Sequence, residues 1–392
     1  MDYAVPEDFH DLAVGDLVSV ELRGRKVEAW VVALEPAEPA ARDLQPLLRW
    51  LGHAANGEVV ELAAWAAWRW ASRSNRFLVT ASPSRRLREM PTPPSWPAAL
   101  ATDSPWAQAA ADAAQAGGGL LLMPAATDPF EVVVGVAAAR REQGSLLVLV
   151  PELGWAQRLA ARLSAAGLPA VTTESEAQAR AGWPVVVGTR SAAFAPLPSL
   201  AGVVVLDAAD ESFAEEGVPT WNALDVLRHR SEVADVPLVA TGALRTATLR
   251  GLVLRSGPEA GGLDASLFRV VDQRERDPKE GLFSVPFVRA TTDALIHADG
   301  RTAGVVAVLN QRGRVALLAC KSCRSVARCE RCAGPMASDG EELICRRCEE
   351  RRPVVCVSCG STTLRALRLG VTGAAEQLGA LLARPVATVE GP

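Results

Sequence analysis

The chain has 392 residues, 49% of them hydrophobic and 22% charged, a composition typical of globular proteins that excludes a wholly disordered chain. At roughly 150 residues per domain, this length predicts two or three domains. The net charge of −4 excludes a general positive field, so any contact with nucleic acid must come from a local patch. No uncharged apolar run approaches the ~18–20 residues of a membrane span, and residues 1–20 lack a basic start followed by an apolar run. We therefore expect a soluble, cytoplasmic protein that makes no membrane contact.

The start of the chain, residues 1–36, has the pattern of short strands. Extended segments at residues 14–20 and 27–34 flank a turn at residues 23–25, and this arrangement indicates a hairpin. We therefore expect the first part of the chain to be rich in β-structure.

Helical patterns follow in residues 44–71, which are expected to form two helices, the second rich in alanine and tryptophan. Trp65 and Trp68 are three positions apart and share a face of that helix, so we favour packing in the core over stacking on bases. Six arginines then follow, with Glu89 the only acid between residues 66 and 90, and these are Arg69, Arg73, Arg76, Arg85, Arg86 and Arg88. They form either a solvated helix end or a patch that contacts phosphates, and the sequence leaves both interpretations open.

A change of pattern marks the next part of the chain. Residues 91–111 begin with a proline-rich stretch and are the best candidate for a linker. Short, continuous apolar runs follow at residues 119–123, 146–150, 185–187, 203–206 and 237–240. Because every position in such a run is apolar, both faces of each strand must be covered, which indicates a parallel sheet flanked by helices. Residues 112–255 are therefore predicted to form an α/β domain, residues 256–285 a second connection, and residues 305–309 a further strand.

The predicted α/β domain lacks the residues with which a phosphate-binding loop holds a nucleotide. Such a loop needs glycines, a lysine for the β- and γ-phosphates and a Ser or Thr for Mg²⁺. None of the lysines follows such a glycine pattern, and these are Lys26, Lys279 and Lys321. Asp128 after the first apolar run would repel phosphate, and Asp207 after a later run is more often a helix N-cap than a metal ligand. We expect neither catalytic residues nor a nucleotide cofactor.

All cysteines of the chain lie in one short segment, where they form four C-x-x-C pairs. The pairs are Cys320/Cys323, Cys329/Cys332, Cys345/Cys348 and Cys356/Cys359. The two-residue spacer lets both thiolates of a pair bind one ion, and two pairs complete a tetrahedral site, so two Zn²⁺ per chain are expected. Iron–sulfur ligation is the less favoured alternative. If the first and second pairs shared one ion, the chain would have to close over only the five residues 324–328, which is tight. A nested arrangement, which joins the second pair to the third and the first to the fourth, fits the spacing. A cross-braced arrangement, which joins the first pair to the third and the second to the fourth, fits it as well.

Arginines surround the cysteine pairs, and these are Arg324, Arg328, Arg331, Arg346, Arg347, Arg351 and Arg352. Each Zn²⁺ site with four thiolates carries a formal charge of −2, so the arginines can offset that charge. Contact with DNA or with a partner protein is the alternative. The sequence does not choose between these two roles.

Four motifs stand out beside the cysteines, and they are Asp2-Tyr3-Ala4-Val5-Pro6, Leu149-Val150-Pro151-Glu152, Gly188-Thr189-Arg190-Ser191-Ala192-Ala193-Phe194-Ala195-Pro196 and Asn310-Gln311-Arg312-Gly313. Together with the eight-cysteine spacing, they resemble the replication-restart family PriA (primosomal protein N′). The family patterns are D-Y-x-V-P, L-V-P-E, G-T-R-S-A-x-F-x-P and N-R-R-G. The resemblance covers nearly the whole chain, and the third motif and the cysteines are specific.

Three segments depart from the family in the positions that serve its ATPase. Ala125-Ala126-Thr127-Asp128-Pro129-Phe130-Glu131 stands where the family has T-G-S-G-K-T-E, so Pro129 replaces the lysine and Phe130 replaces the Mg²⁺-binding hydroxyl. Asp207-Ala208-Ala209-Asp210 replaces D-E-E-H, and Gly242-Ala243-Leu244-Arg245 replaces S-A-T-P. The pattern is similar to the actinobacterial branch, whose members keep the scaffold and lose the ATPase motifs. The later motor motifs and the family's first strand are also missing, which is compatible with a fragment of a longer protein.

The resemblance implies an α/β fold with a helicase-like parallel-sheet domain, a small N-terminal β-rich DNA-binding domain and a C-terminal two-zinc cysteine-rich module. The implied division is residues 1–90 for the N-terminal domain that binds 3′ ends, 91–111 for a linker, 112–285 for a degenerate first helicase lobe, 286–319 for the start of the second lobe, 320–360 for the zinc module and 361–392 for a truncated continuation of the second lobe. No motor activity is expected from this arrangement.

The family also implies a function: a DNA-binding primosome component that recognises stalled or abandoned replication forks and promotes reloading of the replicative helicase. Its partners are then forked DNA with 3′ ends, primosome proteins and the helicase-loading machinery. The alternatives are a functional ATP-dependent 3′–5′ DNA helicase and a non-functional truncated remnant.

The resemblance implies individual site residues as well. Asp2 matches the acid that contacts a 3′-hydroxyl, Gly24 lies near the turn that approaches the terminal base, and Arg25 follows it as a further DNA contact. The family favours the nested order of zinc ligands over the cross-brace. That order gives one site with Cys320, Cys323, Cys356 and Cys359, and another with Cys329, Cys332, Cys345 and Cys348.

Overall fold

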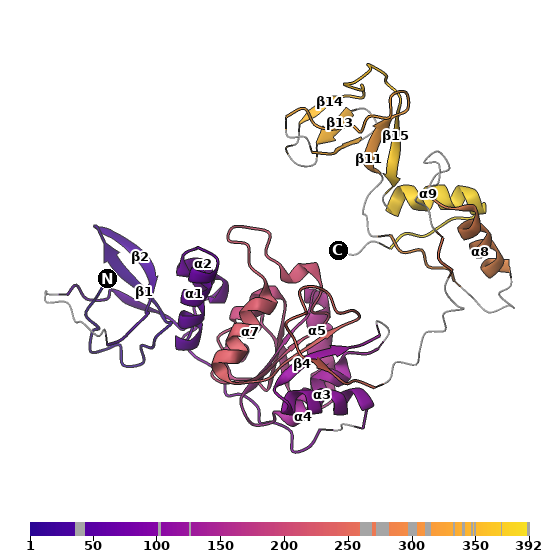
Figure 1. Cartoon of the computed structure of the whole chain (residues 1–392). Helices are drawn as coiled ribbons and strands as arrows, with labels where there is room; N and C mark the ends of the chain where they lie inside the picture. Colours follow the sequence, from indigo (N-terminus) through magenta and orange to yellow (C-terminus); the bar gives the residue numbers. More distant parts are fainter. Residues whose placement is uncertain are drawn as a thin grey trace. The chain divides into compact units, whose positions relative to one another are not determined.

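The computed structural model describes residues 1–35, 44–100, 103–124, 127–258, 269–271, 282–296, 304–309, 315–331, 334–338, 342–345, 348, 350–369 and 371–389. The chain divides into two compact units, Met1–Gly262 and Leu263–Pro392, which are described separately (Figure 1). None of the helices in these described stretches is both long and apolar enough to cross a membrane.

The first unit begins with a three-stranded antiparallel sheet in the order β2-β1-β3. Its strands are β1 (Leu17–Leu22), β2 (Arg25–Trp30) and β3 (Arg49–Gly52). The expected hairpin is confirmed, because Leu22 pairs with Arg25 across a two-residue turn. Arg23 and Gly24 both have positive φ, 51° and 76°, as the tight turns that match the twist of a hairpin require.

Residues 44–71 do not form two helices, so that prediction is wrong. Residues 49–52 pair with β1 as β3, and the single helix α1 (Gly57–Arg69) follows. The Asn56 carboxamide oxygen accepts the Val59 N–H at 3.0 Å, and this N-cap explains why the helix begins only at Gly57. The helix α2 (Ser74–Ala81) completes this region.

The larger part of the first unit is a seven-stranded sheet in the order β10-β4-β9-β8-β5-β7-β6, in which every pairing is parallel. Its strands are β4 (Gly118–Leu122), β5 (Ser145–Leu149), β6 (Ala170–Thr172), β7 (Val185–Gly188), β8 (Leu200–Val205), β9 (Leu238–Gly242) and β10 (Leu254–Arg255). The helices are α3 (Pro105–Gln115), α4 (Phe130–Ala139), α5 (Leu153–Ala165), α6 (Glu176–Ala181) and α7 (Ala223–Ala234), with short 3₁₀ turns at Arg190–Phe194 and Glu211–Phe213. The predicted α/β fold with a parallel sheet is confirmed.

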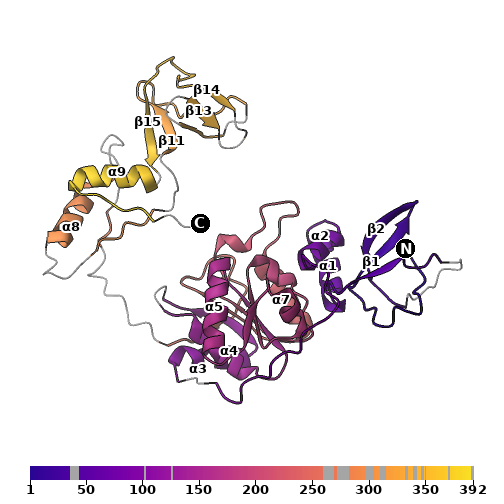
Figure 2. The same cartoon turned by 180° about the vertical axis from the view of Figure 1, so that it is seen from behind.

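Both faces of the large sheet are covered by helices. Along β5, Leu147 and Leu149 belong to a core shared with α1, α2 and α7, whereas Leu146 and Val148 belong to a core shared with α3, α4 and α5. Figure 2 shows α3, α4 and α5 on one side of the sheet and α7 on the other. This double burial is the physical reason that the strands appear in the sequence as continuous apolar runs.

An ion pair fastens α1 to the α/β part of the unit. Arg230 on α7 is only 1% exposed, and its Nε and Nη2 donate to the two carboxylate oxygens of Glu58 at 2.6 and 2.7 Å. The same guanidinium donates to the carbonyl oxygens of Ala193 and Ala195 at 3.1 and 2.8 Å. The side chain of Trp65 stacks on His229 with 3.8 Å between ring centroids, and burial lowers the pKa of His229. The small β-sheet and its helices are therefore attached to the large sheet through buried contacts.

The expectation that Trp65 and Trp68 both pack in the core is wrong for Trp68. Trp65 is half-buried against α7, but Trp68 is 77% exposed. The buried stripe of α1 runs through Val59, Leu62 and Ala66, and position 68 lies about 200° around the helix from position 66. Sharing a face with Trp65 at the edge of that stripe is therefore not enough to bury position 68.

The described residues of the second unit form two short sheets and two helices. Strands β11 (Val315–Cys320) and β15 (Leu364–Leu369) pair antiparallel, and β12 (Met336–Ser338), β13 (Glu342–Cys345) and β14 (Arg351–Pro353) form a three-stranded sheet. The helices are α8 (Val285–Ile296) and α9 (Val371–Leu382). The strand expected at residues 305–309 is wrong, because this segment pairs with no described strand and leaves Val306 and Val308 exposed. The motif Asn310-Gln311-Arg312-Gly313, which follows this segment, lies outside the described residues.

Candidate nucleic-acid interface and metal centre

The residues expected to contact DNA lie on or beside the small sheet of the first unit. Asp2 is exposed over 42% of its side chain and lies 3.8 Å from the terminal ammonium. Gly24 is at the tip of the β1–β2 hairpin, where an added Cβ would meet no atom within 4 Å, and Arg25 is exposed beside it. The Tyr3 hydroxyl donates to the Glu21 carbonyl oxygen at 3.0 Å, which ties the segment around Asp2 to β1 close to the turn. Both parts of the candidate interface are thus open to solvent, one at the hairpin tip and the other in a segment tied to β1.

A buried carboxylate that the sequence reasoning missed supports this sheet. Asp16 is 2% exposed, and its Oδ2 accepts hydrogen bonds from the Ala13 N–H and from Trp50 Nε1, each at 3.0 Å. Its Oδ1 lies 2.9 Å from Nδ1 of His53. These contacts join the loop before β1 to β3 and the residue after it, so Asp16 positions the strands rather than facing a ligand. No motif signals this cluster, because its members are far apart in the sequence.

The six arginines after Trp68 are all exposed in the structure. Arg86 forms an ion pair of 3.0 Å with Glu28 on β2, and the Arg69 guanidinium lies 5.5 Å from the ring centroid of Trp70. Two of the six arginines, Arg86 and Arg69, thus have contacts within the protein. The arginines are distributed over the last turn of α1, the start of α2 and the segment after α2.

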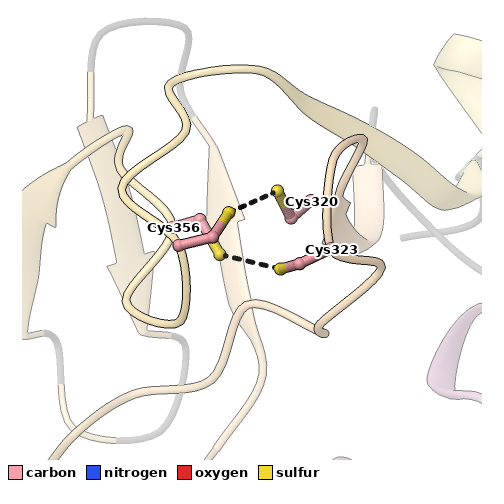
Figure 3. A group of neighbouring side chains, drawn as sticks. Cys320, Cys323 and Cys356 are labelled. Atoms are coloured by element: carbon pink, nitrogen blue, oxygen red, sulfur yellow. Dashed lines mark hydrogen bonds between the residues drawn. The ribbon is translucent and has the colours of Figure 1, made fainter.

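Four cysteines of the second unit converge in an outer cluster, formed by Cys320, Cys323, Cys356 and Cys359. The sulfur atoms of Cys320 and Cys359 are 3.5 Å apart. Those of Cys323 and Cys356 are also 3.5 Å apart (Figure 3). A disulfide would need about 2.05 Å, whereas four sulfurs at 2.3 Å from one ion are about 3.8 Å apart. The geometry therefore fits a metal ion held by four thiolates, with each pair of ligands on its own turn.

A second, inner cluster contains Cys329, Cys345 and Cys348, with 3.6 Å between the sulfurs of Cys329 and Cys348. Cys332, the expected fourth ligand, lies outside the described residues. The seven described cysteines are therefore grouped as in the nested arrangement, and the cross-braced arrangement would have put Cys329 with the outer ligand Cys356. The inner hairpin of β12 and β13 brings Cys345 next to the turn that carries Cys329.

The outer cluster is set up to hold thiolates. The N–H groups of Cys323 and Ser322 lower the pKa of Cys320 to about 6, and hydrogen bonds from Ser325 lower the pKa of Cys323. The Ser361 N–H favours the Cys359 thiolate, but hydrogen bonds with the sulfurs of Cys323 and Cys320 raise the pKa of Cys359 to about 12. A divalent cation bound among the sulfurs is the charge that would let all four of them ionise.

Arginines near the clusters are partly engaged with acids. Arg331 lies 3.6 Å from Glu350 and Arg351 lies 3.5 Å from Glu342. Arg328 and Arg352 line a cavity of about 330 Å³ together with Cys329 of the inner cluster and Cys356 of the outer one. Arg346 and Arg347 lie outside the described residues.

The start of α4, where a nucleotide phosphate would bind, is in contact with the Arg162 side chain of α5. The Asp128 carboxylate accepts the Phe130 N–H at 3.0 Å and lies 2.5 Å from a guanidinium nitrogen of Arg162. That guanidinium also covers the Phe130 ring at 4.1 Å from its centroid. The Arg162 cation is therefore already paired with a carboxylate and a ring at this end of the sheet.

The expectation that Asp207 is a helix N-cap is wrong. The N-cap of the following 3₁₀ turn is Asp210, whose carboxylate accepts the Ser212 N–H at 2.8 Å. Asp207, two residues after the end of β8, has a φ of 50°, and burial, with the charge of Asp210, raises the pKa of its carboxyl. Asp207 lies three residues before Asp210, so it is too far from the 3₁₀ turn to cap it.

A family model described as the 3′ DNA-binding domain (3′BD) of PriA matches residues 1–83, the part that contains the small sheet, α1 and α2. The chain is also similar to a probable replication restart protein PriA from Mycobacterium tuberculosis, with 31% identity over 341 residues, 82% of this chain and 48% of the relative. The protein of the same name from Mycobacterium leprae is 30% identical over 83% of this chain and 50% of its own length. For the replication restart protein PriA of Bacillus subtilis the identity is 28%, over 50% of this chain and 26% of the relative.

These similarities extend from the small sheet through most of the chain, which spans about half the length of the mycobacterial relatives. Because the mycobacterial matches cover more than four-fifths of this chain, they do not rest on the segment of the cysteines alone. The candidate interface and the metal centre thus belong to a chain whose reported relatives are all named as replication restart proteins PriA.

Proposed function

Because this chain belongs to the PriA family of replication restart proteins, we propose that it is a DNA-binding primosome component that recognises 3′ ends at stalled or abandoned forks. It promotes reloading of the replicative helicase through primosome and helicase-loading proteins, and it has no motor activity of its own. The observation that carries this proposal is the match of residues 1–83 to a 3′ DNA-binding domain whose hairpin tip is open to solvent.

The first unit supplies the chemistry for a 3′ end. An exposed carboxylate such as Asp2 accepts a hydrogen bond from a free 3′-hydroxyl and repels a 3′-phosphate. Gly24 leaves the hairpin tip without a side chain, so a terminal base can approach the backbone, and Arg25 supplies a positive charge beside it. We assign Asp2, Gly24 and Arg25 to the DNA contact on these grounds.

The second unit supplies the metal module of the proposal. We assign one Zn²⁺ to Cys320, Cys323, Cys356 and Cys359, and another to Cys329, Cys332, Cys345 and Cys348. Four thiolates close the coordination shell and leave no position for water, so zinc bound there has a structural role. The module then holds β11–β15 and the three-stranded sheet in place as a surface for DNA or partner proteins.

The absence of a motor rests on the start of α4. Pro129 replaces the lysine that would neutralise the phosphates of ATP, and Pro129 also has no N–H to donate to them. The Arg162 guanidinium, which contacts this segment, is already paired with the Asp128 carboxylate and the Phe130 ring. Asp207 lacks the neighbouring carboxylate that would orient water, because Ala208 follows it.

Steady-state ATP hydrolysis measured with and without forked DNA tests this part of the proposal. We expect the rate to stay at that of the reaction without protein, since neither a lysine nor a Mg²⁺-binding hydroxyl is present in the loop. DNA-stimulated turnover of about 1 s⁻¹ or more, in the range of ordinary enzymes, would establish the alternative, an ATP-dependent helicase. Fork binding measured on the same preparation shows that the protein is folded and active in binding.

A further inference from the structure

The corner between α1 and α2 carries an exposed indole next to three exposed arginines. Trp68 and Arg69 are in the last turn of α1, Arg73 is the residue before α2, and Arg76 is in the first turn of α2. These four residues are referred to as the Trp68 corner. All four side chains are exposed, and that of Trp68 is 77% exposed.

Few acidic residues lie near the Trp68 corner along the chain or on α1 and β2. The sequence contains no acid between Glu61 and Glu89. On α1, Glu58 is bound to Arg230, and Glu61 is exposed two turns before Trp68. Glu28 on β2 is paired with Arg86, which is not part of the corner. A polyanion is therefore the partner with complementary charge.

The exposure of Trp68 distinguishes it from the other indoles of α1. Trp65 stacks on His229, and the ring of Trp70 packs on Phe77 with 6.1 Å between ring centroids. Trp68 is involved in no ring contact of this kind among the described residues. A large aromatic face that the fold itself does not cover, next to arginines, has the composition of a platform on which a nucleic-acid base stacks.

We propose that the Trp68 corner binds single-stranded DNA, with the indole of Trp68 stacked on a base and Arg73 and Arg76 in contact with phosphates. This inference rests on the proposed function, because it adds a second contact to a protein that binds 3′ ends. Nucleic acid is favoured over an acidic peptide, since a peptide would use the charge of the arginines but has no base for the indole. The corner also lies within residues 1–83, which match a DNA-binding domain.

One DNA strand can reach both the hairpin tip and the Trp68 corner. From Arg25 the strand β2 runs about 20 Å to Trp30, whose Nε1 donates to Ser82 Oγ at 3.0 Å just after α2. The eight residues of α2 between its end and its first turn add about 12 Å to this path. A strand of 20 nucleotides, at about 3.4 Å for each, is longer than this path, so it suits a test of both contacts.

The test measures binding of a 20-nucleotide oligothymidine, and of the same length of abasic strand, to Trp68→Ala, Trp68→Leu and Trp68→Phe variants. We expect Ala and Leu to weaken binding of oligothymidine about tenfold, and Phe, which keeps an aromatic face, to restore most of it. The abasic strand offers nothing to stack, so the three variants should bind it like the unmodified protein.

Two further variants separate the charges of the corner from charge in general. Arg73→Ala and Arg76→Ala should each lower the slope of log K against log salt by about 0.7. Arg158→Ala removes an exposed charge from α5 and should leave the slope unchanged. The ratio of affinities for 3′-hydroxyl and 3′-phosphate strands should stay the same in all these variants, because that ratio depends on the hairpin site.

Three results would overturn the inference. In the first, Trp68→Ala binds oligothymidine as tightly as the unmodified protein, and only the inference fails, since 3′-end binding persists. In the second, a poly-glutamate peptide binds and loses affinity in Trp68→Ala as much as DNA does, which identifies an acidic-peptide surface. In the third, the unmodified protein binds neither strand, and the proposed function fails together with the inference.

Discussion

Removal of the metal by a strong chelator is expected to unfold residues 320–359 and to leave residues 1–262 folded. The cysteine module buries few apolar side chains besides its ligands, mainly Leu318, Ala327, Met336 and Leu343. Structural zinc sites contribute about 10–16 kcal/mol of apparent binding free energy, which becomes folding free energy where the site does not exist in the unfolded chain. Because such a small core cannot replace this amount, we expect the module to lose its fold.

Amide hydrogen exchange measures this result for both units in one experiment. The N–H groups of Met336 and Cys356, which are bonded to Ala327 and Ser361 carbonyls at 3.0 and 2.8 Å, should exchange rapidly after chelation. The amides of β5 and β8, in the middle of the large sheet, are the control and should stay protected. Persistent protection of Met336 and Cys356 in metal-free protein would contradict a structural role for the metal.

Metal analysis of single variants tests the ligand assignment. Cys345→Ser and Cys356→Ser should each retain about one zinc ion per chain, because each removes a ligand from one site only. A protein lacking residues 329–348 should still hold one zinc with the outer four cysteines. Iron in place of zinc, or a deletion variant with no tightly bound metal, would contradict the nested zinc sites.

The second large effect is expected from Glu58→Gln, which leaves the buried Arg230 cation without its carboxylate. Breaking one partner of a buried ion pair typically costs about 3–5 kcal/mol, and because Glu58 is one-third exposed we expect about 3 kcal/mol in the free energy of unfolding. Urea denaturation of the whole chain, followed by a signal from the large sheet, measures the change. Glu61→Gln, an exposed residue on the same helix, is the matched control and should change stability by less than about 0.5 kcal/mol.

A third variant decides whether the charge or the contacts carry this effect. Arg230→Met removes the buried cation, fills much of its volume and leaves no unpaired guanidinium, but it also leaves the carbonyls of Ala193 and Ala195 without their donor. We expect Arg230→Met to destabilise the first unit less than Glu58→Gln does. If Glu58→Gln unfolds at the same urea concentration as Glu61→Gln, the ion pair does not hold α1 to α7.

The parts of the fold that depend on local pattern were accessible from the sequence. The strands of the large sheet are continuous apolar runs because both of their faces are covered, and Leu146 and Leu147 illustrate this with neighbours in different cores. The hairpin at Gly24 depends on a short turn with positive φ, which local sequence also indicates. The cysteine pairs are defined by a spacer of two residues, so the presence of metal ligands was predictable as well.

The remaining features depend on contacts between residues far apart in the chain. Residues 49–52 form a strand because β1 offers an edge, and no periodicity in four residues announces that pairing. Trp68 is exposed because the large sheet meets α1 on another side, which the three-residue spacing from Trp65 cannot reveal. Asp16 is buried through Trp50 and His53, and these three residues form no motif.

Replication forks that differ only in the chemistry of one 3′ end test 3′-end recognition most directly. A hydrogen bond to a charged group is worth about 1.5–3 kcal/mol, so a 3′-hydroxyl fork should bind roughly tenfold or more tightly than the same fork with a 3′-phosphate. Asp2→Ala should bring the two affinities together. Glu7→Ala, which removes another exposed acid from the same segment, should preserve the difference. Equal affinity of the unmodified protein for both ends would contradict recognition of a free 3′ end.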